Sequence, residues 1–266
     1  MTTSDVFVAR ARAADRLRLR AVNMVAPHGF GYLGQALSSA ELFTTLSAHY
    51  DPDRDDLVVS PGHYIIAAFA SAAETGRLDE ELLATYGHDG SSLEAIGTER
   101  SPGVDLVCGS LGQGLSGAVG FAWARRLRGD TGRVFTMMSD GELEEGQVWE
   151  AAMFAAHHVL GAITVLLDAN DSQVDGPVSS ITTLEPIAAK WEAFGWAAFD
   201  VDGHDVEALE SAVSAAVSDV RPAIVIARTS TRRGLDVLPE DADGHFIKLP
   251  ADLAAAATAE LEARLA

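Results

Sequence analysis

The chain has 266 residues, 48% of them hydrophobic, and a formal net charge of −20 at pH 7. This length and apolar content suffice for a single large domain with a buried sheet, spanning residues 1–266. The acidic composition argues against nucleic acid and against a membrane as partner, because anionic surfaces attract cationic proteins. One cysteine excludes an internal disulfide, and the N-terminal residues lack the apolar stretch of a signal peptide. We therefore expect the protein to be cytoplasmic.

Hydrophobic periodicity predicts mostly helices in the N-terminal half of the chain. The first helix covers residues 5–24, and the second covers 38–50, with Ser38 and Glu41 spaced for a capping box. They are followed by a strand over 57–59, helices over 62–75 and 79–86, and a polar loop over 88–102. The apolar run after this loop contains Cys108, which we expect to pack in the core.

A strand–helix–strand unit dominates the second half of the chain. A helix over 111–127 precedes it, and Asp140 lies in an exposed turn between its first strand and its helix. The predicted elements from there on are strands over 133–138, 163–167, 196–201 and 223–227, helices over 144–159, 184–194 and 206–218, a loop over 232–250 and a terminal helix. This alternation predicts an α/β fold, a doubly wound parallel sheet with helices on both faces and its site at the carboxyl edge.

Asp140 and Asn170 follow the two strands of this unit and lie 30 positions apart (170 − 140). Because parallel strands end at the same edge of a sheet, both side chains are expected to project there. A carboxylate and an amide carbonyl are hard oxygen ligands, which Mg²⁺ combines with water and phosphate oxygens. The spacing therefore predicts a metal-bridged diphosphate, and the alternative is an acidic turn that binds nothing.

Residues 139–176 resemble the thiamine-diphosphate motif of transketolases, in which Gly-Asp-Gly precedes an Asn at a similar distance. The likeness continues through Glu-Gly-Gln-Val-Trp-Glu-Ala, which begins at Glu145, and through the pair His157 and His158. Ser139 replaces the first glycine of the motif. The resemblance implies the thiamin-diphosphate-binding fold and a cofactor, thiamine diphosphate, that is held through Mg²⁺ or through Ca²⁺ in its place.

By this resemblance, two groups of residues surround the cofactor. The first group comprises the metal ligands Asp140, Asn170 and the backbone carbonyl of Ser172, together with Gly141 and Glu142 against the diphosphate. The second group is the family's glycine-rich loop, represented by Gly109, Ser110, Leu111 and Gly112. Free amides at the start of a helix attract phosphate, which agrees with this assignment. Taken alone the loop is a weak signal, since such glycines more often only shape a turn.

Two histidines are implied as catalytic by the same resemblance. His63 ends a Ser-Pro-Gly-His segment similar to the family's Ser-Lys-Gly-His, and is expected beside both cofactor and substrate. His245 matches a late catalytic histidine, and the alternative is a loop histidine in solvent. Tyr32 stands where the family's Gly-His-x-Gly-Gly segment has its histidine, and so is expected to contact the substrate. His28 either reaches the same site or caps the first helix.

The resemblance covers the whole chain but only the N-terminal half of a transketolase. The glutamate that activates the cofactor belongs to a pyrimidine-binding domain, which corresponds to the missing half. This implies an alpha subunit whose beta subunit carries that domain, assembled as α2β2, which transfers a two-carbon ketol unit between small-molecule substrates. The alternatives are a C2 transferase that uses a 2-oxo acid, like pyruvate dehydrogenase or deoxyxylulose phosphate synthase, and a catalytically silent subunit that stabilises its partner.

Overall fold

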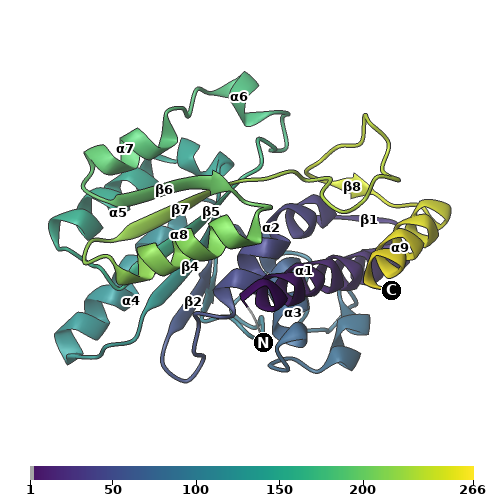
Figure 1. The fold of residues 1–266 in the computed structure, drawn as a ribbon, viewed down its shortest axis with the longest axis horizontal. Helices are drawn as coiled ribbons and strands as arrows, with labels where there is room; N and C mark the ends of the chain where they lie inside the picture. The colour runs from purple at the N-terminus through teal and green to yellow at the C-terminus, as the bar shows by residue number, and fades with distance from the viewer. Residues whose placement is uncertain (1–2) are drawn as a thin grey trace.

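A parallel sheet runs through the middle of the molecule, with helices on both faces (Figure 1). The computed structural model describes residues 3–266. Within them the strand order is β3-β2-β4-β5-β7-β6, and every neighbouring pair is parallel. The strands are β2 (Asp56–Val59), β3 (Leu106–Val107), β4 (Val134–Ser139), β5 (Ile163–Ala169), β6 (Ala197–Asp202) and β7 (Ala223–Arg228). The prediction of a doubly wound α/β fold is confirmed.

Two hydrophobic cores lie on opposite faces of this sheet. Phe135 and Met137 of β4 point into one core, whereas Val134 and Met138 point into the other, as the alternation of side chains along a strand requires. The first core is formed with α1 (Thr3–Val25), α2 (Leu33–Leu46), α3 (Ile65–Glu74) and α8 (Val206–Ser218). The second is formed with α4 (Gln113–Arg128), α5 (Gly146–His157) and α7 (Ile187–Ala193). Strands covered on both faces explain the continuous apolar runs of the sequence.

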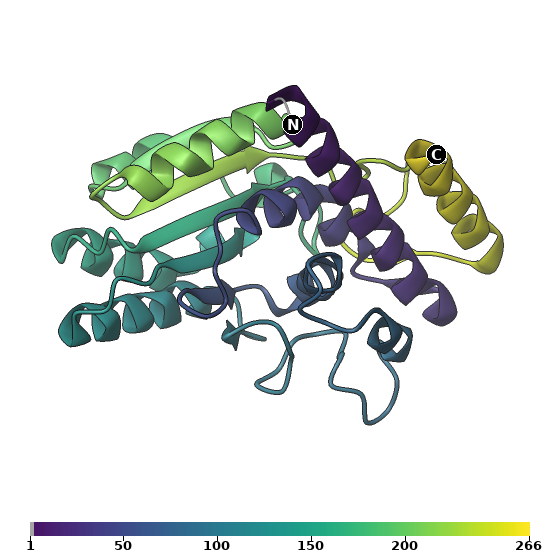
Figure 2. The same ribbon diagram turned by 60° about the horizontal axis from the view of Figure 1, so that its bottom comes forward.

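The last helix, α9 (Ala251–Leu265), packs beside α1 (Figure 2). A second, two-stranded sheet precedes it, in which β1 (Phe30–Gly31) pairs antiparallel with β8 (Ile247–Lys248). This pairing ties the segment before α2 to the loop before α9, and so brings Tyr32 next to His245. The remaining short elements are η1 (Ala26–His28), η2 (Gly62–Tyr64), η3 (Glu80–Thr85), η4 (Gly141–Glu144) and α6 (Val178–Ile181).

Two of the predicted helices differ clearly from the structure. Helix α2 begins at Leu33 instead of residue 38, because its first turn is buried by tertiary contacts that outweigh the capping-box signal. Ser38 therefore lies inside the helix, where its hydroxyl donates to the carbonyl of Gln35. The helix expected over 144–159 is interrupted at Glu145, whose extended backbone separates η4 from α5.

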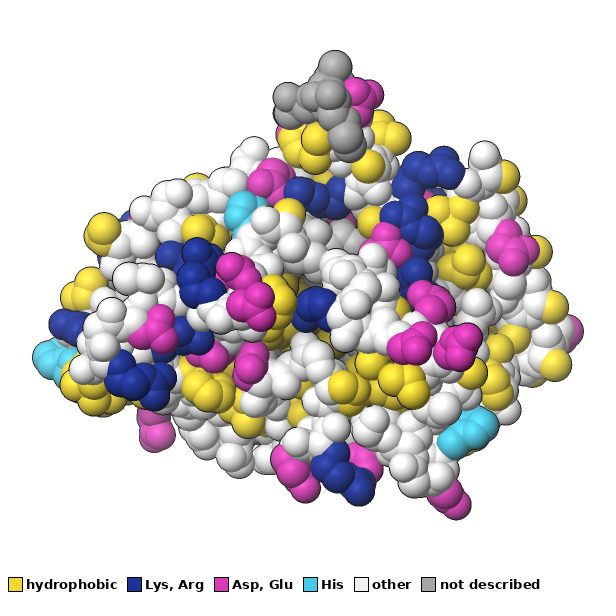
Figure 3. All heavy atoms as spheres, turned by 90° about the horizontal axis from the view of Figure 1, so that it is seen from below, with side chains coloured by type: hydrophobic (Ala, Val, Ile, Leu, Met, Phe, Trp, Pro, Cys, Tyr) yellow, Lys and Arg dark blue, Asp and Glu magenta, His cyan; other side chains and the backbone are white. Residues whose placement is uncertain are grey.

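Cys108 does not lie in the core, contrary to expectation. It is half-buried, because the preceding strand β3 is the edge of the sheet and pairs only with β2. The surface seen from below mixes Lys and Arg with Asp and Glu side chains, and neither sign forms a continuous patch there (Figure 3). Among the residues that the structure describes, no helix is long and apolar enough to cross a membrane.

Candidate active site

Asp140 and Asn170 lie at the carboxyl ends of β4 and β5, which the sheet places side by side. The Asp140 carboxylate accepts backbone N–H groups from Gly141 at 2.9 Å and from Asp171 at 2.7 Å. Asp171 supplies that amide from a left-handed backbone conformation, with a φ of 58°. Asp140 was expected in an exposed turn, but only 4% of it is exposed, because the loop after β5 folds over it.

A buried polar network orients Asn170. Its side-chain nitrogen donates to the Tyr64 hydroxyl at 3.0 Å, to the Asp168 carboxylate at 2.9 Å and to the Ser38 hydroxyl at 3.2 Å. Its side-chain oxygen accepts the backbone N–H of Ser172 at 3.0 Å. Because Asp168 can only accept when ionised, the amide nitrogen faces the network and the oxygen faces the loop that carries Ser172.

The electrostatics of this edge favour a cation. Burial raises the pKa of Asp140 to about 7, and the neighbouring carboxylates of Asp168 and Asp171 add to that rise. Burial also raises the pKa of Asp168. Several carboxylates gathered in a poorly solvated place repel one another unless a cation balances them. The oxygen donors of Asp140, Asn170 and the Ser172 carbonyl fit Mg²⁺ or Ca²⁺, which both prefer oxygen ligands.

Glu142 is fully buried beneath the glycine-rich loop. Its carboxylate accepts from the Ser60 hydroxyl, from the Gly112 amide at 2.9 Å and from the Ser139 amide at 3.2 Å. Burial raises its pKa to about 7. Glu142 thus ties the start of α4 to the end of β4. The rest of the predicted loop, Gly109, Ser110 and Leu111, is exposed.

Three of the predicted site residues form one aromatic group. The ring centroids of His63 and His245 are 4.9 Å apart, and Tyr32 lies 5.1 Å from His63 and 5.7 Å from His245. Burial and the adjacent His245 lower the pKa of His63 to about 3. Burial also lowers the pKa of His245, against opposing effects from Asp243 and from a hydrogen bond to the backbone of Ser172. Both rings are therefore uncharged at neutral pH.

His28 is not brought to this group. Its Nε2 atom lies 2.7 Å from the carbonyl oxygen of Tyr86, and its ring packs against the rings of Tyr86 and His88. It occupies the last position of η1, after α1 has ended. His28 thus fixes the segment after η3 and neither caps α1 nor contacts the histidine pair.

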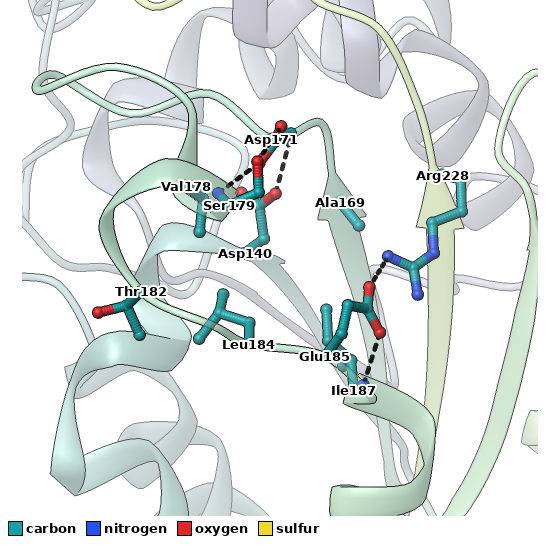
Figure 4. A pocket seen from close by; sticks show the side chains of 10 residues that line it. All are labelled: Asp140, Ala169, Asp171, Val178, Ser179, Thr182, Leu184, Glu185, Ile187 and Arg228. Carbon is teal, nitrogen blue, oxygen red and sulfur yellow. Dashed lines mark hydrogen bonds and ion pairs between the residues drawn. The ribbon is translucent and has the colours of Figure 1, made fainter.

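Two pockets adjoin the Asp140 edge. One, of about 250 Å³, is lined by Asp140, Asp171 and Leu184, with Glu185 and Arg228 paired at its side (Figure 4). The other, of about 540 Å³, lies between the loop 170–177 and the segment 242–244. The wall of the second pocket holds two candidate metal ligands, Asn170 and Ser172, together with three Asp side chains, so an anion there would need a cation beside it.

Three residues of this site were not predicted. The sequence could have indicated Asp168, since a carboxylate inside an apolar strand requires a buried partner. No sequence pattern indicates Tyr64 or Gln35, because the contacts of Tyr64 with Asn170 and of Gln35 with His245 join segments far apart in the sequence.

A parallel sheet with a carboxylate and an amide at its carboxyl edge, facing two neutral histidines, is the architecture of a cofactor-dependent α/β enzyme domain. The family described as transketolase, thiamine diphosphate binding domain, matches residues 9–261. The chain belongs to this family.

Similar proteins include chains of the same length and much longer ones. A transketolase family protein from Sinorhizobium fredii is 37% identical over 248 residues, with 89% of each chain covered. The 6-deoxy-6-sulfo-D-fructose transketolase subunit from Clostridium sp. is 35% identical over 260 residues, with 94% of each covered. The transketolase structure from Campylobacter jejuni superposes with a TM-score of 0.88 at 26% identity, covering 98% of this chain and 43% of that one. The chain thus spans less than half of that solved transketolase.

Proposed function

We propose that the chain is the cofactor-binding alpha subunit of a two-component transketolase, which transfers a two-carbon ketol unit between small-molecule substrates. The single observation that carries this is the convergence of Asp140, Asn170, His63 and His245 on one edge of the sheet. The likeness over 94% of both chains to a protein named as a transketolase subunit supports a second component. A partner beta subunit supplies the pyrimidine-binding domain and its activating glutamate. We propose an α2β2 assembly in the cytoplasm.

The candidate metal site holds Mg²⁺, or Ca²⁺ in its place, through Asp140, Asn170 and the Ser172 carbonyl. Gly141 directly follows Asp140 and lies against the diphosphate in this proposal. Gly109, Ser110 and Leu111 line the approach to this edge, while Glu142 holds Gly112 in place from below. When bound, thiamine diphosphate supplies the carbon nucleophile of the reaction.

The residues of this chain position the substrate around that cofactor. His245 is buried and His63 is half-buried, and both are neutral, so each can donate a hydrogen bond to a substrate oxygen on which negative charge develops. Such bonds are stronger in a site with little water than at an exposed surface. The Tyr32 hydroxyl beside these rings adds a further hydrogen-bond donor.

A reconstitution experiment tests the proposal. The purified chain, its beta subunit and their mixture are assayed for ketol transfer with thiamine diphosphate and Mg²⁺. Turnover is expected only in the mixture, because in this proposal the beta subunit supplies the activating acid and the other half of the substrate pocket. Turnover by the isolated chain would refute the two-component assignment, and an inactive but well-formed complex would refute the catalytic one.

Tyr32 favours a second candidate for the substrate that donates the two-carbon unit. The residue lies against both histidines, where a family member with histidine would offer a proton-transfer group. A donor substrate without the hydroxyl group that such a histidine would contact, for example a 2-oxo acid, is compatible with tyrosine at position 32. Assays with pyruvate and with a ketose phosphate separate the two donors.

A further inference from the structure

Gln35 lies in the first turn of α2 and reaches the catalytic candidate His245. Its side-chain nitrogen is 3.1 Å from the Nδ1 atom of His245, and only 1% of Gln35 is exposed. The Ser39 hydroxyl donates to the backbone carbonyl of Gln35. Burial leaves the Gln35 side chain little room, so its amide stays next to the imidazole.

The orientation of the Gln35 amide decides where His245 carries its proton. With the nitrogen toward His245, the side-chain oxygen is left without a partner among residues 3–266. The reverse orientation would instead leave the amide nitrogen, with its two N–H groups, without a partner. Unpaired buried N–H groups are rarer in proteins than carbonyl oxygens that lack a partner. The first orientation is therefore preferred.

The orientation of the Gln35 amide sets the role of the ring nitrogen that it faces, because an amide N–H can only donate. A neutral imidazole has one donor and one acceptor, so the nitrogen that faces Gln35 is the acceptor. Asp243 accepts the backbone N–H groups of His245 and Phe246, at 2.8 and 3.3 Å.

We propose that Gln35 is a positioning residue that fixes His245 as the tautomer with its proton on Nε2. The ring then carries its single N–H donor on Nε2, the nitrogen that does not face Gln35. Its catalytic consequence rests on the proposed function: His245 acts as a hydrogen-bond donor to a substrate or cofactor oxygen. The tautomer itself is a property of this chain alone.

Nitrogen NMR of the full-length chain with ¹⁵N-labelled histidine tests the tautomer at neutral pH. The sequence has 8 histidines, and His245→Asn identifies the signals of interest. In the wild type we expect a protonated Nε2 and a bare Nδ1. Gln35→Met should shift both signals toward a mixture of tautomers, and Gln35→Glu should reverse the preference, because a carboxylate only accepts. Gln147→Met, at an exposed glutamine of α5, should change neither signal.

An activity measurement with the beta subunit separates positioning from a structural role. Gln35→Met should lower kcat by about tenfold or more with a smaller change in KM, since a donor aimed at developing charge is lost. A protonated Nδ1 in the wild type, or an unchanged tautomer in both Gln35 variants, would overturn the proposal. If the complex proves inactive while the NMR result holds, the proposed function fails and the tautomer assignment stands.

Discussion

At the scale of single residues, the candidate site depends on buried polar groups that each have a defined partner. Asn170 is oriented by Asp168 and Tyr64, and Glu142 by amides on both of its sides. Buried groups with fixed partners keep their geometry when a ligand binds, which lowers the reorganisation that binding requires. Two substitutions test the roles assigned here.

Asp140→Asn should abolish stabilisation by Mg²⁺ and thiamine diphosphate together. In the wild type, the pKa of the Asp140 carboxyl group is raised from its ordinary value to about 7. The ionised carboxylate therefore destabilises the metal-free fold once the pH exceeds the ordinary pKa, and this destabilisation is complete above about pH 7. The variant should therefore melt no lower than the wild type without ligands, yet fail to respond to them. Thermal unfolding of the complex with and without ligands measures this, with Asp53→Asn in an exposed turn as control. An unchanged response would remove Asp140 from the metal site.

Tyr32→His should raise kcat/KM for a ketose phosphate and lower it for the natural donor. An imidazole restores the proton-transfer group of the family, an effect of about 1–3 kcal/mol in transition-state binding. Tyr32→Phe is the matched control, because it keeps the ring contacts with His63 and His245 but loses the hydroxyl. If neither variant changes the preference between ketose phosphate and pyruvate, Tyr32 only packs against the histidines.

At the scale of elements, the start of α2 organises the site. Gly34 packs so closely on the segment 243–245 that a Cβ atom there would overlap the carbonyl oxygen of Gly244. The helix thus carries Tyr32, Gln35 and Ser38 toward His63, His245 and Asp168, respectively. The first turn of α2 therefore sets the spacing between the histidine pair and the sheet edge that carries Asp140 and Asn170.

Gly34→Ala should therefore damage both stability and activity. The methyl group forces α2 away from Gly244, with an expected loss of about 1–3 kcal/mol in the free energy of unfolding. Because the displacement moves His245, kcat/KM should fall by more than the loss of folded protein would explain. Gly120→Ala is the control, since a Cβ atom there meets nothing within 4 Å in helix α4. Urea unfolding and kinetics of the reconstituted complex measure the two effects, and equal behaviour of the variants would contradict the close contact.

At the scale of the whole molecule, the sequence predicts what is local and misses what is distant. Continuous apolar runs predicted β4, β5 and β7, and amphipathic spacing predicted α8 over residues 206–218. The two-residue strands β1 and β8 have no detectable pattern. Asp140 and Asn170 were found because both follow strands of one unit. The contact of Gln35 with His245 spans 210 positions, so no local pattern signals it.

The pairing of β1 with β8 also affects the order of folding. Phe30 and Lys248 are register partners although 218 positions separate them (248 − 30). Closing so long a loop carries a large entropy penalty, which is offset only after the intervening sheet has formed. Since this ladder holds Tyr32 against His245, the histidine pair assembles after the sheet that carries Asp140 and Asn170. In a newly made chain, the sheet edge with Asp140 and Asn170 is therefore expected to form before His245 reaches Tyr32.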